Sequence, residues 1–149
     1  MEIAELEQIL RMIAAAAVGI AIGFNRELRG KPLGMRTLAL VALGSAIAAL
    51  AALDFLPAAA SADAIARVVQ GILSGVLTGI GFIGAGVVLR DRHSATVHGL
   101  TTAATVWITA ALGIACALVS WVIVVSGIGL TLAILFGLGW IEHHLMSQD

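Results

Sequence analysis

The sequence predicts an all-α polytopic membrane protein, a bundle of five transmembrane helices. Hydrophobic residues make up 60% of the 149 residues and charged residues only 11%, whereas about 25% of the residues in a typical soluble domain are charged. The apolar segments are about 20 residues long, which is the length that a helix needs to cross a bilayer. They do not alternate polar and apolar residues over about 10 positions, the pattern typical of a transmembrane barrel.

Five segments have the length and hydropathy expected of transmembrane helices. They are Gln8–Phe24, Met35–Leu53, Ile65–Leu89, Leu100–Leu118 and Trp121–Ile141. The ends of the first two carry Arg11 and Arg36, and long basic side chains can extend from such positions to the interface. Glu7 lies four residues before Arg11, a spacing suited to an ion pair along a helix.

The basic residues predict how the five helices are oriented. Six of the eight lysines and arginines lie at the first and third connections, and two, Arg11 and Arg67, lie at the other side. The positive-inside rule then places the N-terminus outside and the C-terminus in the cytoplasm. We expect residues 1–149 to form a single transmembrane domain, with no soluble C-terminal domain.

Composition and spacing argue against several classes of function. The net charge is −1, and the basic residues form no stripe of the kind that binds nucleic acid. Asp91, His93 and His98 do not have the spacing of a familiar metal site, and no catalytic constellation or carboxylate in the middle of a span is present. We therefore expect no enzyme activity, no bound metal and no cofactor. Cys116, the only cysteine, is expected to be a small core residue.

Glycines are concentrated in the third predicted span. Val68–Leu89 has no charged residue but six glycines, and each glycine costs about 1 kcal/mol relative to alanine in a helix interior. In a membrane such a run indicates either close helix packing or a locally opened backbone near a functional centre. Gly79–Gly84 also matches the dinucleotide-binding pattern G-x-G-x-x-G, but it lies inside an apolar span and lacks the strand and acidic residue that this motif requires.

Two faces of small residues are candidates for a dimer interface. One contains Ala15, Gly19 and Gly23, and the other contains Gly71, Gly75 and Gly79. Packing within the monomer would explain either face equally well.

The first connection carries the densest charge in the chain. We predict a binding or functional cluster made of Arg26, Glu27, Arg29, Arg36 and Thr37. Glu27 is the only acid among the charged residues there, so we expect it to pair with Arg26, Arg29 or Arg36. Such a cluster could bind a lipid headgroup, phosphate or a carboxylate on a partner, because arginine suits bidentate recognition of oxyanions. The alternative is a set of solvated charges that only determine topology.

The fourth span begins with small and hydroxyl residues. Thr101, Thr105 and Thr109 share one helical face, where hydroxyls can bond to the preceding turn or to a neighbouring helix. A second possibility is that this face forms one wall of a small cavity opposite Gly81–Gly86. The predicted intramembrane centre consists of Gly79, Gly81, Gly84, Gly86, Thr101, Thr102 and Thr105.

Three ordered segments together resemble the MgtC/SapB family of bacterial membrane proteins. They are residues 23–37, which contain Arg26-Glu27 and Arg36-Thr37, the glycine motif 79–86, and the segment 99–107. The resemblance implies an inner-membrane protein linked to growth under magnesium limitation and, in pathogens, to survival inside host cells. It also implies that the signature residues of the charge cluster and the glycine and threonine centre carry the function.

The resulting hypothesis is a non-enzymatic inner-membrane protein, a homodimer, that acts in adaptation to low magnesium through lipid or membrane-protein partners. One alternative is a transporter or channel for Mg²⁺ or a small solute, with its path between the third and fourth spans. Another is a passive subunit of a membrane assembly.

Overall fold

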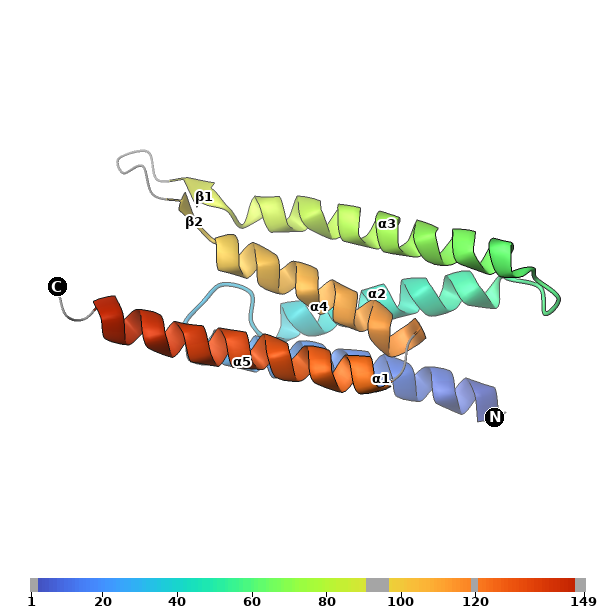
Figure 1. Ribbon diagram of the computed structural model, residues 1–149, viewed down its shortest axis with the longest axis horizontal. Helices are drawn as coiled ribbons and strands as arrows, with labels where there is room; N and C mark the ends of the chain where they lie inside the picture. The colour runs from blue at the N-terminus through green and yellow to red at the C-terminus, as the bar shows by residue number, and fades with distance from the viewer. Residues whose placement is uncertain (1–2, 91–96, 119–120, 147–149) are drawn as a thin grey trace.

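Over the residues that the structure describes, the protein is a bundle of five long helices with one short hairpin (Figure 1). The computed structural model describes residues 3–90, 97–118 and 121–146. The elements are α1 (Ile3–Leu28), α2 (Met35–Asp54), α3 (Ala62–Gly86), β1 (Leu89–Arg90), β2 (Val97–His98), α4 (Leu100–Leu118) and α5 (Trp121–Met146). All five helices are long and apolar enough to cross a membrane, which confirms the predicted all-α class.

The predicted spans match the helices closely, and the differences lie at the ends. α1 is longer than its apolar core and extends to Leu28, so it includes Arg26 in its last turn. α3 ends at Gly86 rather than Leu89, because the chain then enters an antiparallel pairing of Leu89 with His98. With five spans, the two termini lie at opposite ends of the bundle (Figure 1).

Local sequence explains how the helices begin and end. Ser61 caps the N-terminus of α3, since its hydroxyl accepts a hydrogen bond from the Ala64 N–H at 3.3 Å. Gly30 follows α1 with a φ of +60°, the left-handed conformation that glycine adopts at helix C-termini. The chain thereby turns from α1 into α2 within a few residues.

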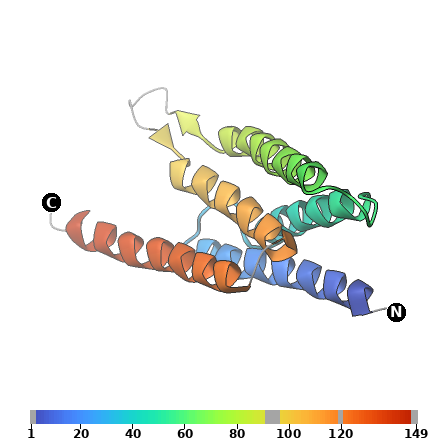
Figure 2. The same ribbon diagram turned by 45° about the vertical axis from the view of Figure 1, so that its right-hand side comes forward.

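The core lies between α1, α2 and α4. In the apolar segment of α4, 56% of the residues are buried, whereas only 11% are buried in the apolar segments of α3 and α5. The ribbon views show α3 and α5 on opposite sides of α4 (Figures 1 and 2). α4 is therefore the central helix, and α3 and α5 are peripheral.

Small residues allow α1 and α4 to approach α2 closely. A Cβ added at Gly19 would lie 2.6 Å from the Ala39 Cα, and one added at Gly23 would lie 2.5 Å from the Met35 Cα. Neither position leaves room for a side chain, so the face containing Ala15, Gly19 and Gly23 packs inside the monomer. Gly113 of α4 has the same role, since a Cβ there would lie 2.8 Å from the Ala42 Cα.

The glycine-rich helix α3 does not provide these close approaches. Only Gly84 of its six glycines has a neighbour near an added Cβ, namely the Ala103 Cβ at 3.5 Å. The other five, Gly71, Gly75, Gly79, Gly81 and Gly86, face open space. The helix also runs without a break to Gly86, so the expectations of tight packing along the whole run or of an opened backbone near 79–86 are wrong for the monomer.

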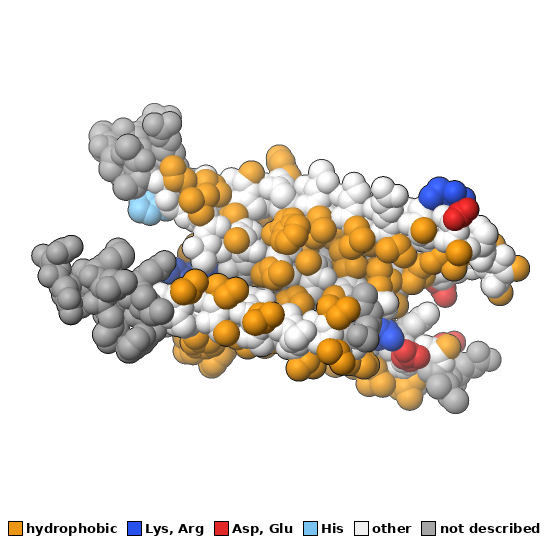
Figure 3. All heavy atoms as spheres, viewed as in Figure 1, with side chains coloured by type: hydrophobic (Ala, Val, Ile, Leu, Met, Phe, Trp, Pro, Cys, Tyr) orange, Lys and Arg blue, Asp and Glu red, His pale blue; other side chains and the backbone are white. Residues whose placement is uncertain are grey.

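The surface agrees with a membrane location. In Figure 3 hydrophobic side chains cover the long sides of the helices, and the visible charged side chains lie near the helix ends. Large apolar side chains such as Phe82, at 84% exposed, and Val122, at 76%, point outward. In lipid such exposure carries no hydrophobic penalty, because the surrounding hydrocarbon is as apolar as the side chains.

Candidate functional site

The predicted charge cluster lies where α1 ends and α2 begins, but its ion pairing differs from the prediction. Glu27 forms no ion pair with Arg26, Arg29 or Arg36. Within the described residues the salt bridge that forms is Arg11–Glu7, with a nitrogen–oxygen distance of 2.9 Å. That pair confirms the expected bond between residues four apart on α1.

Glu27 instead caps the next helix. Its Oε2 accepts a hydrogen bond from the backbone N–H of Met35, the first residue of α2, at 3.3 Å. Gly34, the N-cap residue of α2, has no side chain that could do this, and the same carboxylate oxygen lies 2.7 Å from the place of a Cβ on Gly34. The first N–H groups of a helix need acceptors and favour negative charge. The carboxylate therefore caps the N-terminus of α2 and does not pair with a neighbouring arginine.

A polar pocket opens at this end of the bundle. Its volume is about 610 Å³. It is lined by Glu27, Gly30, Lys31, Gly34, Met35, Arg36 and Thr37. The pocket combines two basic side chains, one carboxylate, a hydroxyl and the N-terminus of α2, so its net positive charge favours an anionic group.

Arg29 is directed away from that pocket toward α5. Its guanidinium carbon lies 5.6 Å from the centre of the Phe136 ring, and Nη2 donates to the Phe136 carbonyl at 3.3 Å. This contact is a cation–π interaction at the edge of the apolar region. Arg29 thus connects the end of α1 to α5 and does not line the pocket that contains Arg36.

Arg26 is buried in the bundle, with only 4% of the residue exposed. Its Nη2 donates a hydrogen bond to the hydroxyl of Thr102 on α4. Its Nε has no hydrogen-bond partner, and neither does Nδ2 of the preceding residue, Asn25. An arginine keeps its proton in proteins, and a buried charge without compensation costs several kcal/mol. This pair of residues is the most unusual polar feature of the core.

The threonines of α4 bond largely to their own helix. The Thr105 hydroxyl donates to the Thr101 carbonyl and the Thr109 hydroxyl to the Thr105 carbonyl, each at 2.7 Å. Thr102 and Thr105 are buried and Thr101 is exposed. These bonds agree with the structural alternative for the threonine face, and they give no support to a polar cavity opposite Gly81–Gly86.

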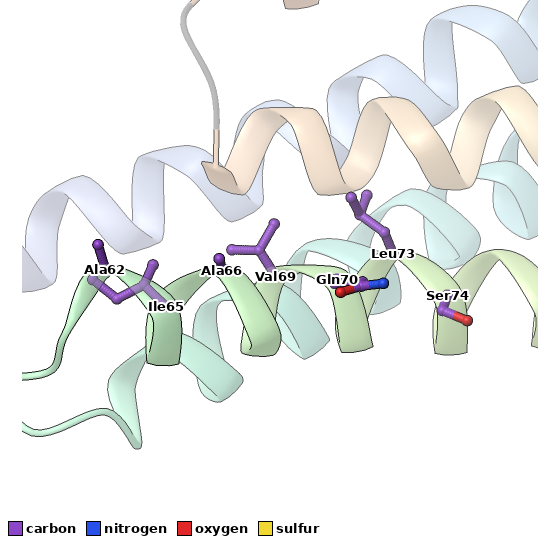
Figure 4. A pocket seen from close by; sticks show the side chains of 7 residues that line it. All are labelled: Ala62, Ile65, Ala66, Val69, Gln70, Leu73 and Ser74. Carbon is purple, nitrogen blue, oxygen red and sulfur yellow. The ribbon is translucent and has the colours of Figure 1, made fainter.

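Two further hollows on the protein are apolar, and side chains of α3 line both of them, in one case together with α2. One, of about 420 Å³, lies between α2 and α3 and includes Gly75 and Gly79. The other, of about 620 Å³, is lined entirely by α3 side chains, with Val69 and Leu73 pointing toward α4 (Figure 4). Both suit hydrocarbon better than an ion.

Arg11 is an important contact that the sequence only partly predicted. Besides its pair with Glu7, its Nη1 donates to the carbonyls of Cys116 at 2.9 Å and Ala117 at 3.3 Å. These are among the last carbonyls of α4, which lack partners within the helix. The guanidinium carbon also lies 5.8 Å from the centre of the Trp121 ring on α5. In the sequence, the only sign that Arg11 would bind the end of α4 is its position as a lone arginine early in an apolar helix.

Sequence reasoning also missed the buried Asn25. Its only sign in the sequence is a single amide beside Arg26 near the end of an apolar run.

The histidine-containing third connection is only partly described. Asp91 and His93 lie outside the described residues, and His98 is exposed in β2. Among the described residues, no group of three histidine, cysteine, aspartate or glutamate side chains lies close enough together to hold a metal ion. Cys116 is fully buried, as a small core residue should be.

Comparison with known proteins gives a consistent assignment. The model of the MgtC family matches residues 12–144. The chain is 43% identical over 137 residues to SrpB of Synechococcus elongatus, covering 85% of this chain and 72% of that protein. It is 35% identical over 143 residues to the protein named "Putative magnesium transporter YhiD" of Escherichia coli K12, covering 96% and 66%. It is 41% identical over 110 residues to MgtC of Salmonella typhimurium strain 14028s, covering 74% and 43%.

The chain therefore spans from less than half to about three quarters of the length of these relatives. No solved structure matches it significantly. The family match covers most of the chain, including the charge cluster and the segments that contain Gly84 and Thr102. A multi-pass helical membrane protein with this match belongs to the MgtC family.

Proposed function

We propose that this chain is a non-enzymatic protein of the bacterial inner membrane that acts in adaptation to low magnesium by binding a lipid or membrane-protein partner. The N-terminus lies outside and the C-terminus in the cytoplasm in this proposal, because most basic residues lie at the end of the bundle with the α1–α2 connection. The magnesium link is supported by family membership and by the name of YhiD.

The observation that carries the proposal is the open pocket between α1 and α2. Arg36 and Lys31 are exposed and line it, while Glu27 is already bonded to the Met35 N–H. The pocket thus offers two basic side chains at the membrane edge that form no ion pair with a described acid, and with Glu27 its lining carries a net charge of +1. A phosphate of a lipid headgroup or a carboxylate on a partner protein would complete it.

A buried positive charge weighs against a route for Mg²⁺ between α1 and α4. The buried charge of Arg26 lies between α1 and α4, and no described carboxylate offsets it. A fixed, buried cation repels a second cation, as basic residues do in pores that exclude cations. Transport of Mg²⁺ or a small solute, with a path between α3 and α4, is the alternative function.

Growth of a bacterial strain that lacks its own family member tests the proposal. In low magnesium, wild-type protein should restore growth, and Arg36→Gln combined with Lys31→Gln should not. Arg67→Gln, an exposed arginine on α3 at the opposite end, is the matched control and should restore growth. Protein levels and thermal unfolding of the purified variants show whether each protein still folds.

Two results would contradict the proposal. Full growth with the double variant at matched protein level would favour a passive assembly subunit. Saturable Mg²⁺ flux into liposomes that contain only the wild-type protein would favour the transporter, particularly if Gly84→Leu or Glu27→Ala abolished it.

A further inference from the structure

Thr37, in the first turn of α2, lines two hollows of opposite character. The first is the polar pocket of about 610 Å³ at the α1–α2 connection. The second, here called the apolar groove, is the hollow of about 420 Å³ between α2 and α3. Because one residue borders both, a charged hollow at the membrane edge leads into an apolar one inside the membrane.

The apolar groove lies in the half of the membrane next to the polar pocket. Its lining runs from Thr37 to Ser45 on α2 and from Gly75 to Ile83 on α3. Each stretch covers eight residue steps, which is about 12 Å of helix. One leaflet makes up half of a hydrocarbon core of about 30 Å. The groove therefore follows most of the depth of one leaflet, where a lipid tail lies.

Three glycines keep the apolar groove open. Gly44 on α2 and Gly75 and Gly79 on α3 line it, and a Cβ added at any of them would meet nothing within 4 Å. Packing within the monomer does not require these glycines, although each costs about 1 kcal/mol relative to alanine inside a helix. The Ser45 hydroxyl in the groove wall donates to the Val41 carbonyl at 2.8 Å. It needs no polar partner, so the groove suits hydrocarbon.

The charge of the polar pocket selects the head of the ligand. Lys31 and Arg36 together with Glu27 give its lining a net charge of +1. The Glu27 carboxylate already accepts a hydrogen bond from the Met35 N–H, which makes it a poorer acceptor for an ammonium group. The N–H groups of Arg36 and Thr37 belong to the first turn of α2, where N–H groups lack acceptors within the helix. A phosphodiester with one negative charge and no ammonium group complements this lining.

We propose that an anionic phospholipid occupies both hollows, with its phosphate beside Lys31 and Arg36 and one acyl chain in the apolar groove. The assignment rests on the proposed function, because it names the partner of the same pocket. A free anion would leave the groove empty.

The size of the groove argues against a protein helix as its occupant. A helix with its side chains is about 10 Å across, so 12 Å of helix would occupy roughly 900 Å³, about twice the volume of the groove. A single hydrocarbon chain is much thinner. A second copy of the chain can cover the exposed side of α3 without entering the groove.

Native mass spectrometry of the purified full-length protein in detergent tests the assignment. The protein is mixed with equal amounts of phosphatidylglycerol, which carries one negative charge, and zwitterionic phosphatidylethanolamine with the same acyl chains. The wild type should retain about tenfold more phosphatidylglycerol than phosphatidylethanolamine. Glycerol phosphate, a similar head without acyl chains, should not displace the bound lipid. These two measurements need no variant.

A matched pair of variants tests the groove. Gly44→Leu places a side chain in it and should retain about tenfold less phosphatidylglycerol than the wild type. Gly81→Leu, at an equally open glycine that does not line the groove, should retain as much as the wild type. Thermal unfolding of both variants shows whether they fold.

Four results would overturn the assignment. Equal retention of the two lipids by the wild type would remove the charge argument. Displacement by glycerol phosphate, or unchanged retention in a folded Gly44→Leu protein, would show that the groove holds no acyl chain. A Gly44→Leu protein that changes only in self-association would show that a second copy fills the groove.

The proposed function can fail or survive separately. If the wild type shows no preference for phosphatidylglycerol while Arg36→Gln with Lys31→Gln still abolishes growth in low magnesium, the pocket binds a protein partner and only the lipid assignment is wrong. Full growth with that double variant would contradict the proposed function, whichever lipid the wild type retains.

Discussion

Replacing Gly113 by alanine tests the closest approach in the core. A Cβ at this position would lie 2.8 Å from the Cα and 2.9 Å from the carbonyl carbon of Ala42 on α2. Carbon atoms in good contact are about 3.5–4.0 Å apart, so α2 and α4 would have to separate by roughly 1 Å. The obstacle is backbone, which cannot rotate away as a side chain can.

The size of the effect follows from two opposing terms. Forcing an extra group into a packed core costs about 1–3 kcal/mol, and the rigid neighbour places this case near the upper value. Replacing glycine by alanine inside a helix increases the free energy of unfolding by about 1 kcal/mol. The expected net loss is about 2 kcal/mol, which lowers the folding equilibrium constant about 30-fold.

The matched control is Gly129→Ala on α5, where an added Cβ meets nothing within 4 Å. This variant should be as stable as the wild type or more stable by up to about 1 kcal/mol. Both proteins can be unfolded reversibly in mixed micelles with increasing SDS and followed by tryptophan fluorescence. If Gly113→Ala proved as stable as Gly129→Ala, α2 and α4 would not cross as closely as described, and the argument would be wrong.

Two further predictions concern contacts between helices and between copies of the chain. Arg11→Met should destabilise the protein by about 2 kcal/mol, because it removes charged hydrogen bonds to the end of α4, including the one to Cys116. Glu7→Gln should cost less than about 1 kcal/mol, since Glu7 is 61% exposed, and equal losses of stability for the two variants in the SDS titration would contradict this prediction. Gly75→Leu should weaken the proposed homodimer at least tenfold in a fluorescence energy-transfer assay with labelled protein, because Gly75 faces open space on α3; the equally open Gly129→Leu is the control, and an unchanged dimer would exclude this face.

The sequence was sufficient to predict the helices but not which faces they bury. Hydropathy placed α2 within one residue and α4 without error, since apolar length and the residues that bound it are local properties. The glycine spacing of α3 indicated a capacity for close packing, whereas the close approaches occur at Gly19, Gly23 and Gly113. In a membrane an apolar helix face can contact lipid or protein at similar cost, so spacing alone cannot choose between them.

The charge cluster illustrates the same limit. All its residues lie near one end of the bundle, as predicted, but sequence proximity did not reveal their partners. The Glu27 carboxylate accepts a hydrogen bond from the backbone N–H of Met35, because the start of α2 lies beside it. Arg26 points into the core because α1 extends through Leu28. Both outcomes depend on how α1, α2 and α4 meet, which is information that no single segment contains.

The central position of α4 has a consequence for the order in which the bundle is completed in the cell. Domains form as the chain is made from its N-terminus, and α4 is the fourth helix to emerge. α1 and α2 can cross at Gly19 and Gly23 before then, but Arg26 has no Thr102 to bind and Arg11 has no α4 carbonyls. The first hairpin therefore carries two arginines that lack their acceptors on α4, and α4 then supplies a hydrogen-bond acceptor to each of them, at opposite ends of the bundle.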